Sequence, residues 1–298
     1  MKNTIYHLIT FLIFFFIGYN IAPFPPMVSV VIPTYNRAHL LPRAIESVLT
    51  QTMQDFELVI VDDASTDNTQ ELLKQYKKKS NKIKVITHTT NQGVSAARNT
   101  GNKNALGKYI IILDSDDYAL PNMLEDSVRF MENNPSLVIG IPAKMGFKTN
   151  RTDQLMPWHY PAYDFLQGNH LGNVGNIFKR DFIQKHNISY KKEYICAEDY
   201  DFWIQIILNG GGVGKIEDEK HLPIFTTAFR IHSENNYKDF CYKNSKKIWN
   251  NIFSFLNLPP NQNTPCHQMK KLLEIYPHLL LSHEKERAIS ALCSPSKK

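Results

Sequence analysis

The stretch Lys108-Tyr-Ile-Ile-Ile-Leu-Asp114-Ser-Asp116-Asp117 joins a fully apolar run to three carboxylates within four residues. The apolar part has no alternating polar face, so it predicts a central strand of a sheet that is covered on both sides. If the chain stays extended after the strand, Asp114 and Asp116 point to the same side. Two such carboxylates about 4 Å apart repel by roughly 1 kcal/mol in water and by about 4 kcal/mol near a protein surface.

We therefore expect a cation beside this acidic segment. Hard oxygen ligands are typical of Mg²⁺ or Mn²⁺ sites, and such ions usually hold substrate phosphates as well. An isolated Asp-x-Asp pattern is more often a solvated acidic turn in front of a helix, so the interpretation depends on what the rest of the chain places nearby.

Working outward, short apolar runs alternate with amphipathic stretches from Val28 onward. Strands are predicted at 28–32, 56–61 and 83–86 before the acidic one, with helices at 40–49, around 72–76 and from Gly93 to Gly101. This alternation predicts an α/β fold with an open, mostly parallel sheet, in which ligands bind at the carboxyl ends of the strands. Every polar cluster of this region follows such a strand end.

The composition is that of a globular protein with a sizeable core, with 298 residues of which 43% are hydrophobic and 21% charged. The net charge of +6 is mild and diffuse; it suits an anionic substrate or membrane surface and gives no support for a nucleic-acid partner. The four cysteines are widely spaced, so neither a disulfide framework nor a zinc site is indicated, and a reducing compartment is the simpler interpretation.

Residues 5–22 are almost continuously apolar. This run is slightly short for a transmembrane helix and long for a signal-peptide core. We expect membrane association through an uncleaved anchor with the main domain on the cytosolic face, although scarce flanking charge determines the orientation weakly. A cleaved signal or an upstream extension before Met27 are the alternatives. The predicted divisions are 1–26, a main domain at 27–235 with halves 27–118 and 119–235, and a helical C-terminal extension at 236–298.

Five segments, in this order and spacing, together resemble the family 2 glycosyltransferases, which are inverting nucleotide-sugar enzymes with the GT-A fold. The segments are Val30-Val-Ile-Pro-Thr-Tyr-Asn-Arg37, Val61-Asp-Asp-Ala-Ser-Thr-Asp-Asn-Thr69, Asn91-Gln-Gly-Val-Ser-Ala-Ala-Arg-Asn99, Leu113-Asp-Ser-Asp-Asp117 and Ala197-Glu-Asp-Tyr-Asp-Phe-Trp203. The resemblance covers residues 28–232. It implies a Rossmann-like, mostly parallel sheet flanked by helices, and a nucleotide-sugar donor.

The resemblance assigns the nucleotide to the first half of the domain. It implies that Pro33, Tyr35 and Asn36 lie beside the base and ribose. Asp62 would accept a hydrogen bond from a uracil imide N–H, since an ionised carboxylate is acceptor-only; a cap for the following helix is the alternative. Arg98, one turn into a helix, would lie close to the diphosphate together with the helix N-terminus, unless it is an ordinary surface arginine.

The resemblance also implies a Mn²⁺ or Mg²⁺ site and a catalytic base. Asp116 would contact the metal, Asp114 the ribose, Asp117 would be a second ligand, and His232 a phosphate or metal contact with a structural role as the alternative. Asp199 would take the proton of the acceptor hydroxyl as it attacks the anomeric carbon, a role worth about 10²–10⁴-fold in rate. Its alternative is a first-turn partner of the helix dipole.

The function expected from the resemblance is metal-dependent transfer of a hexosyl or N-acetylhexosaminyl group, from a UDP-sugar, in cell-surface glycan synthesis. The acceptor would be a lipid-linked glycan, a surface polysaccharide or a protein. The sequence has no Gln-x-x-Arg-Trp block of processive synthases, which favours single addition. A dinucleotide-dependent oxidoreductase is excluded because Pro33-Thr-Tyr-Asn-Arg37 stands where Gly-x-Gly-x-x-Gly is needed. A sugar-nucleotide-forming nucleotidyltransferase and a catalytically silent nucleotide- or carbohydrate-binding module are the alternatives.

Overall fold

A computed structural model gives the fold of the protein. It describes residues 24–148, 151–158, 172–194, 197–220, 222–231, 248, 265–277, 279–280, 285–286 and 289. The predicted segment 5–22 and His232 lie outside these residues. Within the described part of the chain, no helix is long and apolar enough to cross a bilayer.

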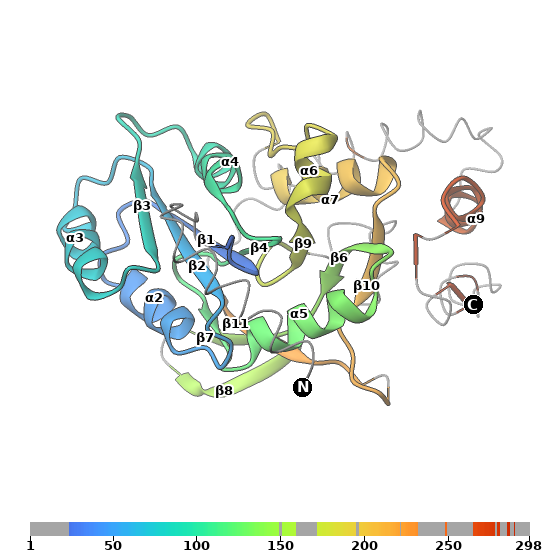
Figure 1. The fold of residues 1–298 in the computed structure, drawn as a ribbon, viewed down its shortest axis with the longest axis horizontal. Coiled ribbons are helices and arrows are strands. Elements are labelled where there is room, and N and C mark those ends of the chain that lie inside the picture. The colour runs from blue at the N-terminus through green and yellow to red at the C-terminus, as the bar shows by residue number, and fades with distance from the viewer. Residues whose placement is uncertain are drawn as a thin grey trace, which may run out of the picture.

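A central seven-stranded sheet organises the described residues (Figure 1). Its order is β10 (Gly212–Lys215), β6 (Leu137–Ile141), β9 (Ile177–Lys179), β4 (Tyr109–Ile112), β1 (Val28–Thr34), β2 (Phe56–Asp62) and β3 (Ile83–Thr87). Only β9 runs antiparallel to its neighbours β4 and β6. The four strands predicted from apolar runs are all present, and the mostly parallel sheet is confirmed.

Helices cover both faces of this sheet. The central strands are apolar along their length, and alternate residues point to opposite faces, so both faces have to be covered. Figure 1 shows α4, α6 and α7 on one side and α2 and α5 on the other. The bounds are α2 (Leu41–Leu49), α3 (Thr69–Lys79), α4 (Val94–Asn104), α5 (Met123–Asn133), α6 (Arg180–Lys185) and α7 (Glu198–Leu208). Two buried clusters result, one under α2, α3 and α5 and one under α4, α6 and α7.

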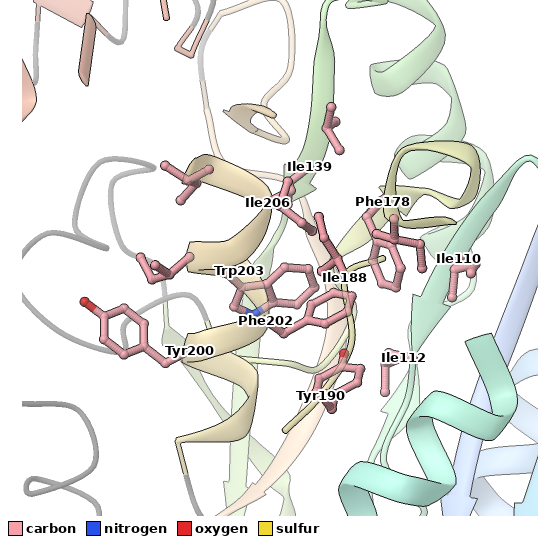
Figure 2. Packing of buried hydrophobic residues seen from close by; sticks show 14 of the residues in the cluster. Ile110, Ile112, Ile139, Phe178, Ile188, Tyr190, Tyr200, Phe202, Trp203 and Ile206 are labelled. Carbon is pink, nitrogen blue, oxygen red and sulfur yellow. The ribbon is translucent and has the colours of Figure 1, made fainter. Parts of the chain in front are cut away.

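The second of these clusters contains an aromatic group that packs α7 against the sheet (Figure 2). Phe202 of α7 stacks on Tyr190 with ring centroids 4.1 Å apart and an interplanar angle of 4°. The Phe178 ring of β9 meets Phe202 and Trp203 edge-on at 5.3 and 5.6 Å. These contacts fix the position of the α7 N-terminus, where the predicted base is found.

A smaller four-stranded sheet was not anticipated from the sequence. Its order is β5 (Tyr118–Ala119), β11 (Phe225–Ile231), β7 (Ala143–Lys148) and β8 (Arg151–Trp158). All of it except Tyr118 lies within the region 119–235, where the sequence shows no regular periodicity. Within the predicted helical extension 236–298, the structure has the helix α9 (Pro265–Ile275).

Gly101 allows α4 to approach β1 closely. A Cβ at this position would collide with Cγ1 of Val31. Gly101→Ala is therefore expected to lower the free energy of unfolding by about 1–3 kcal/mol, because helix or strand must shift to admit the methyl group. Adding Val31→Ala should recover part of this loss, since it removes the opposing methyl. Chemical denaturation of the two single variants and the double variant measures the coupling; strictly additive losses would contradict the contact.

Candidate functional site

A cavity of about 380 Å³ opens at the carboxyl ends of β1, β2 and β4, beside the N-terminus of α4. Five of the predicted site residues line it: Pro33, Tyr35, Arg98, Asp114 and Asp116. A cavity of about 450 Å³ between α5 and the segment after β10 is larger, but none of the predicted site residues lines it. The strand-end cavity is therefore the candidate site.

The end of β1 is tied to the segment after β2 by Asn36. The residue adopts a positive φ of 52°. Its side-chain Oδ1 accepts hydrogen bonds from the backbone N–H groups of Thr66 and Asp67, at 2.8 and 3.3 Å. Asn36 thus shapes the wall of the cavity but does not line it, whereas the neighbouring Tyr35 is 42% exposed at its rim.

The two aspartates that follow β2 have different surroundings. Asp62 is fully buried; its Oδ1 accepts from the Ser65 N–H at 3.1 Å, and its Oδ2 has no hydrogen-bond partner. Asp63, which the sequence analysis did not single out, lines the cavity. It accepts from the Gln92 and Gly93 N–H groups and lies 2.7 Å from Nδ1 of His88. Neither aspartate caps α3.

Asp63 therefore fixes the turn that leads into α4. At that turn Gly93 has a φ of 89°, a conformation that favours glycine. The N-terminus of α4 consequently faces the cavity, and its free N–H groups make this edge suited to an anion. The doubled aspartate was the only signal for Asp63 in the sequence, and that signal does not tell which of the two carboxylates turns toward the site.

Arg98 of α4 is buried and bridges two carboxylates. Its Nη2 lies 3.0 Å from Oδ1 of Asp114, and its Nη1 lies 2.7 Å from Oε1 of Glu198. Burial alone would lower the pKa of Arg98, but Asp114 and Glu198 together raise it, so the guanidinium stays charged. The alternative of a surface arginine is wrong, since only 7% of the side chain is exposed.

The acidic segment forms a turn and does not continue the strand, contrary to the prediction. β4 ends at Ile112, and the Asp117 N–H donates to the Asp114 carbonyl at 3.1 Å. Asp114 and Asp116 still share the cavity, because the turn returns both carboxylates to it. Asp117 is buried and its Oδ1 accepts from the Arg230 N–H at 2.7 Å.

The electrostatics of this turn fit a divalent cation. Burial and the nearby carboxylates of Asp114 and Asp116 raise the pKa of Asp117 well above its ordinary value. Among the residues that the structure describes, no cluster of three or more Asp, Glu, His or Cys side chains could hold a metal ion by itself. Mg²⁺ and Mn²⁺ do not need one when substrate phosphates complete the coordination, so the oxygen donors at the cavity suit such an ion.

Asp199 lies in the first turn of α7, as predicted, with Glu198 before it. Its Oδ1 accepts a hydrogen bond from the Tyr200 N–H at 2.8 Å. Lys144 of β7 connects this helix electrostatically to the acidic turn. Burial lowers the pKa of Lys144 to about 8, and Asp199, Asp117 and Asp114 oppose that shift, Asp199 most strongly. Sequence reasoning missed Lys144, because it lies on a strand of the second sheet.

Structural comparison defines the class of fold. The chain matches the Staphylococcus aureus TarS structure in complex with UDP-GlcNAc with a TM-score of 0.62, at 22% identity, over 83% of this chain and 70% of that one. It matches the mannosyltransferase PcManGT of Pyrobaculum calidifontis, in complex with GDP-Man and Mn²⁺, with a TM-score of 0.58 at 17% identity, over 94% and 80% of the two chains. The fold is GT-A.

The chain belongs to glycosyl transferase family 2, whose family model matches residues 29–195. It is 32% identical to an uncharacterised glycosyltransferase of Methanocaldococcus jannaschii, over 78% of this chain and 82% of that protein. It is also 32% identical to the poly(ribitol-phosphate) beta-N-acetylglucosaminyltransferase TarP of Staphylococcus aureus, over 74% and 75%. It spans only 29% of a poly(ribitol-phosphate) beta-glucosyltransferase of Bacillus spizizenii, again at 32% identity.

Proposed function

We propose that the protein transfers a sugar from a UDP-sugar to an acceptor hydroxyl with inversion, one sugar per encounter, in cell-surface glycan synthesis. The observation that carries the proposal is the convergence of Asp114, Asp116 and the α4 N-terminus on one cavity in a family 2 chain. The similarity to TarP, a poly(ribitol-phosphate) beta-N-acetylglucosaminyltransferase, supports an N-acetylhexosaminyl group as the transferred sugar and a polyol-phosphate polymer as the acceptor.

The donor nucleotide would bind across the ends of β1 and β2. The exposed ring of Tyr35 at the cavity rim is placed to stack on a base. The contact with a uracil imide N–H that the resemblance assigns to Asp62 is not supported by the geometry, because Asp62 is fully buried and does not line the cavity, whereas the adjacent Asp63 does. The free N–H groups at the start of α4 would receive the diphosphate, so its negative charge lies at the positive end of the helix dipole.

Asp116 would hold Mn²⁺ or Mg²⁺ with the help of Asp114, while Asp117 and His232 are the further ligands expected from the resemblance. When bound, such an ion offsets the charge of the diphosphate and acts as a Lewis acid toward the departing UDP. One oxygen of the Asp117 carboxylate already accepts a hydrogen bond from the Arg230 N–H beneath the turn, so less of this side chain is available to the ion than of Asp116.

Asp199 would act as general base. The acceptor oxygen forms a bond to the anomeric carbon from the face opposite UDP, the bond from that carbon to the diphosphate oxygen breaks, and the acceptor proton moves to the Asp199 carboxylate. Tyr200 N–H holds one oxygen of this carboxylate at 2.8 Å. Lys144 supplies a neighbouring positive charge that favours the ionised form of Asp199 before the reaction.

The test is release of UDP from a panel of UDP-sugars by the purified full-length protein. We expect release from one or two donors, stimulated by a polyol-phosphate or glycan acceptor, supported by Mn²⁺ or Mg²⁺ and abolished by a chelator. Formation of a nucleotide sugar from UTP and a sugar phosphate would favour the nucleotidyltransferase alternative. Tight UDP binding with no release for any donor and acceptor pair would favour the silent binding module.

A further inference from the structure

Arg98 joins three parts of the chain that are far apart in sequence. It belongs to α4, its Nη2 contacts Asp114 of the acidic turn, and its Nη1 contacts Glu198 of α7, 100 residues away. Two separate nitrogens are used, one for each carboxylate. A lysine at this position has a single side-chain nitrogen, so it cannot contact the two carboxylates through two separate nitrogens.

The positive charge of Arg98 is already paired with carboxylates, so little of it is available to attract a diphosphate. One guanidinium is shared between two carboxylates, and the side chains of Arg98 and Glu198 are only 7% and 11% exposed. Removing one member of such a buried group leaves an uncompensated charge, so the group behaves as a unit. The expected role of Arg98 as a direct diphosphate contact is therefore less well supported by its geometry than a role within this bridge.

A second contact runs parallel to the bridge. Asn99, the next residue of α4, donates from Nδ2 to the Tyr190 carbonyl at 2.7 Å and accepts from the Tyr190 N–H at 2.8 Å. The Tyr190 ring in turn stacks on Phe202 of α7, as Figure 2 shows, and lies 5.4 Å from the Arg98 guanidinium. Two consecutive residues of α4 thus determine where α7 begins.

We propose that Arg98 is a positioning residue, which acts through Glu198 to hold Asp199 at a fixed place relative to Asp114. Glu198 and Asp199 are consecutive in the first helical turn, so a rigid hold on one side chain restricts the backbone of the other. The inference rests on the proposed function, because it concerns the geometry of the base relative to the donor site. A misplacement of about 1 Å at such a site costs on the order of 10²-fold in rate.

The experiment compares Arg98→Lys, Glu198→Gln and the double variant in steady-state kinetics with the full-length protein. We expect kcat to fall on the order of 10- to 100-fold in each single variant, with UDP affinity measured by calorimetry changed by no more than about twofold. The double variant should lose little more than either single one, because both remove the same link. Arg129→Lys, which alters an exposed arginine paired with Asp126, is the matched control and should leave kcat unchanged.

Hydrogen–deuterium exchange provides a readout that does not depend on activity. Backbone amides of the first α7 turn should exchange faster in Arg98→Lys and in Glu198→Gln than in the wild type or in Arg129→Lys. If Arg98→Lys does not fold, Glu198→Gln tests the same link from the opposite side. Exchange and kinetics together separate the two proposals, since a wild type that transfers no sugar contradicts the function without altering the exchange result.

Three outcomes would overturn the inference. A loss of UDP affinity in Arg98→Lys that parallels the loss of kcat would make Arg98 a direct donor contact. Losses that simply add in the double variant, or unchanged exchange at the α7 N-terminus, would mean that Arg98 and Glu198 act independently.

Discussion

Asp199→Asn is expected to reduce sugar transfer by about 10²–10⁴-fold, because the amide keeps the shape of the side chain but cannot accept the acceptor proton. Nucleotide binding should be retained, since Asp199 belongs to α7 and does not line the strand-end cavity. The measurements are single-turnover transfer with a saturating donor and UDP affinity by calorimetry. Near wild-type turnover in this variant would remove Asp199 from the mechanism.

The structure supplies a matched control for this experiment. Asp181 opens α6 as Asp199 opens α7, and each accepts a hydrogen bond from the N–H of the next residue at 2.8 Å. If Asp199 served only as a first-turn partner of the helix dipole, Asp181→Asn and Asp199→Asn would have similar, small effects on stability and none on transfer. We expect similar shifts in Tm for the two variants and a loss of transfer in Asp199→Asn alone.

The fold of residues 27–118 was predictable from the sequence because each of its strands is marked by a local pattern of residues. A buried parallel strand reads as an uninterrupted apolar run, and its carboxyl end is marked by the first polar residues after it. The runs ending at Ile32, Val61 and Ile112 all became neighbouring strands, so their polar ends had to meet. Even there, the choice between Asp62 and Asp63 was beyond the sequence, because it depends on the φ values of a short turn.

The second sheet could not be predicted from local sequence patterns, because most of its strand pairings are long-range. β5 pairs with β11, more than a hundred residues later, and β11 pairs with β7, so β7 and β8 are the only strands of this sheet that are neighbours in both the sheet and the sequence. Lys144 approaches the acidic turn only through these long-range pairings, and the Arg98–Glu198 contact is equally non-local. Such contacts leave no periodic pattern in the sequence; the five motif segments contain Arg98 and Glu198 but not Lys144.

Asp116→Ala is expected to abolish the increase in UDP affinity that Mn²⁺ gives the wild type, and to lower transfer by on the order of 10²-fold or more. Asp116 lines the cavity, and its carbonyl accepts from Nη2 of Arg43 at 3.3 Å, so the backbone should stay in place when the carboxylate is removed. Calorimetric titration of UDP with and without Mn²⁺ measures the first effect directly, independent of any acceptor.

Asp117→Asn distinguishes the role of Asp117 in metal binding from that of Asp116. Asp117 is buried and its oxygen accepts from the Arg230 N–H, a bond that an asparagine carbonyl can keep. The variant should therefore retain most of the Mn²⁺ enhancement that Asp116→Ala loses. If instead Asp117→Asn removed the enhancement and Asp116→Ala preserved it, the metal would have to bind beneath the turn, and the donor would need a different orientation in the cavity.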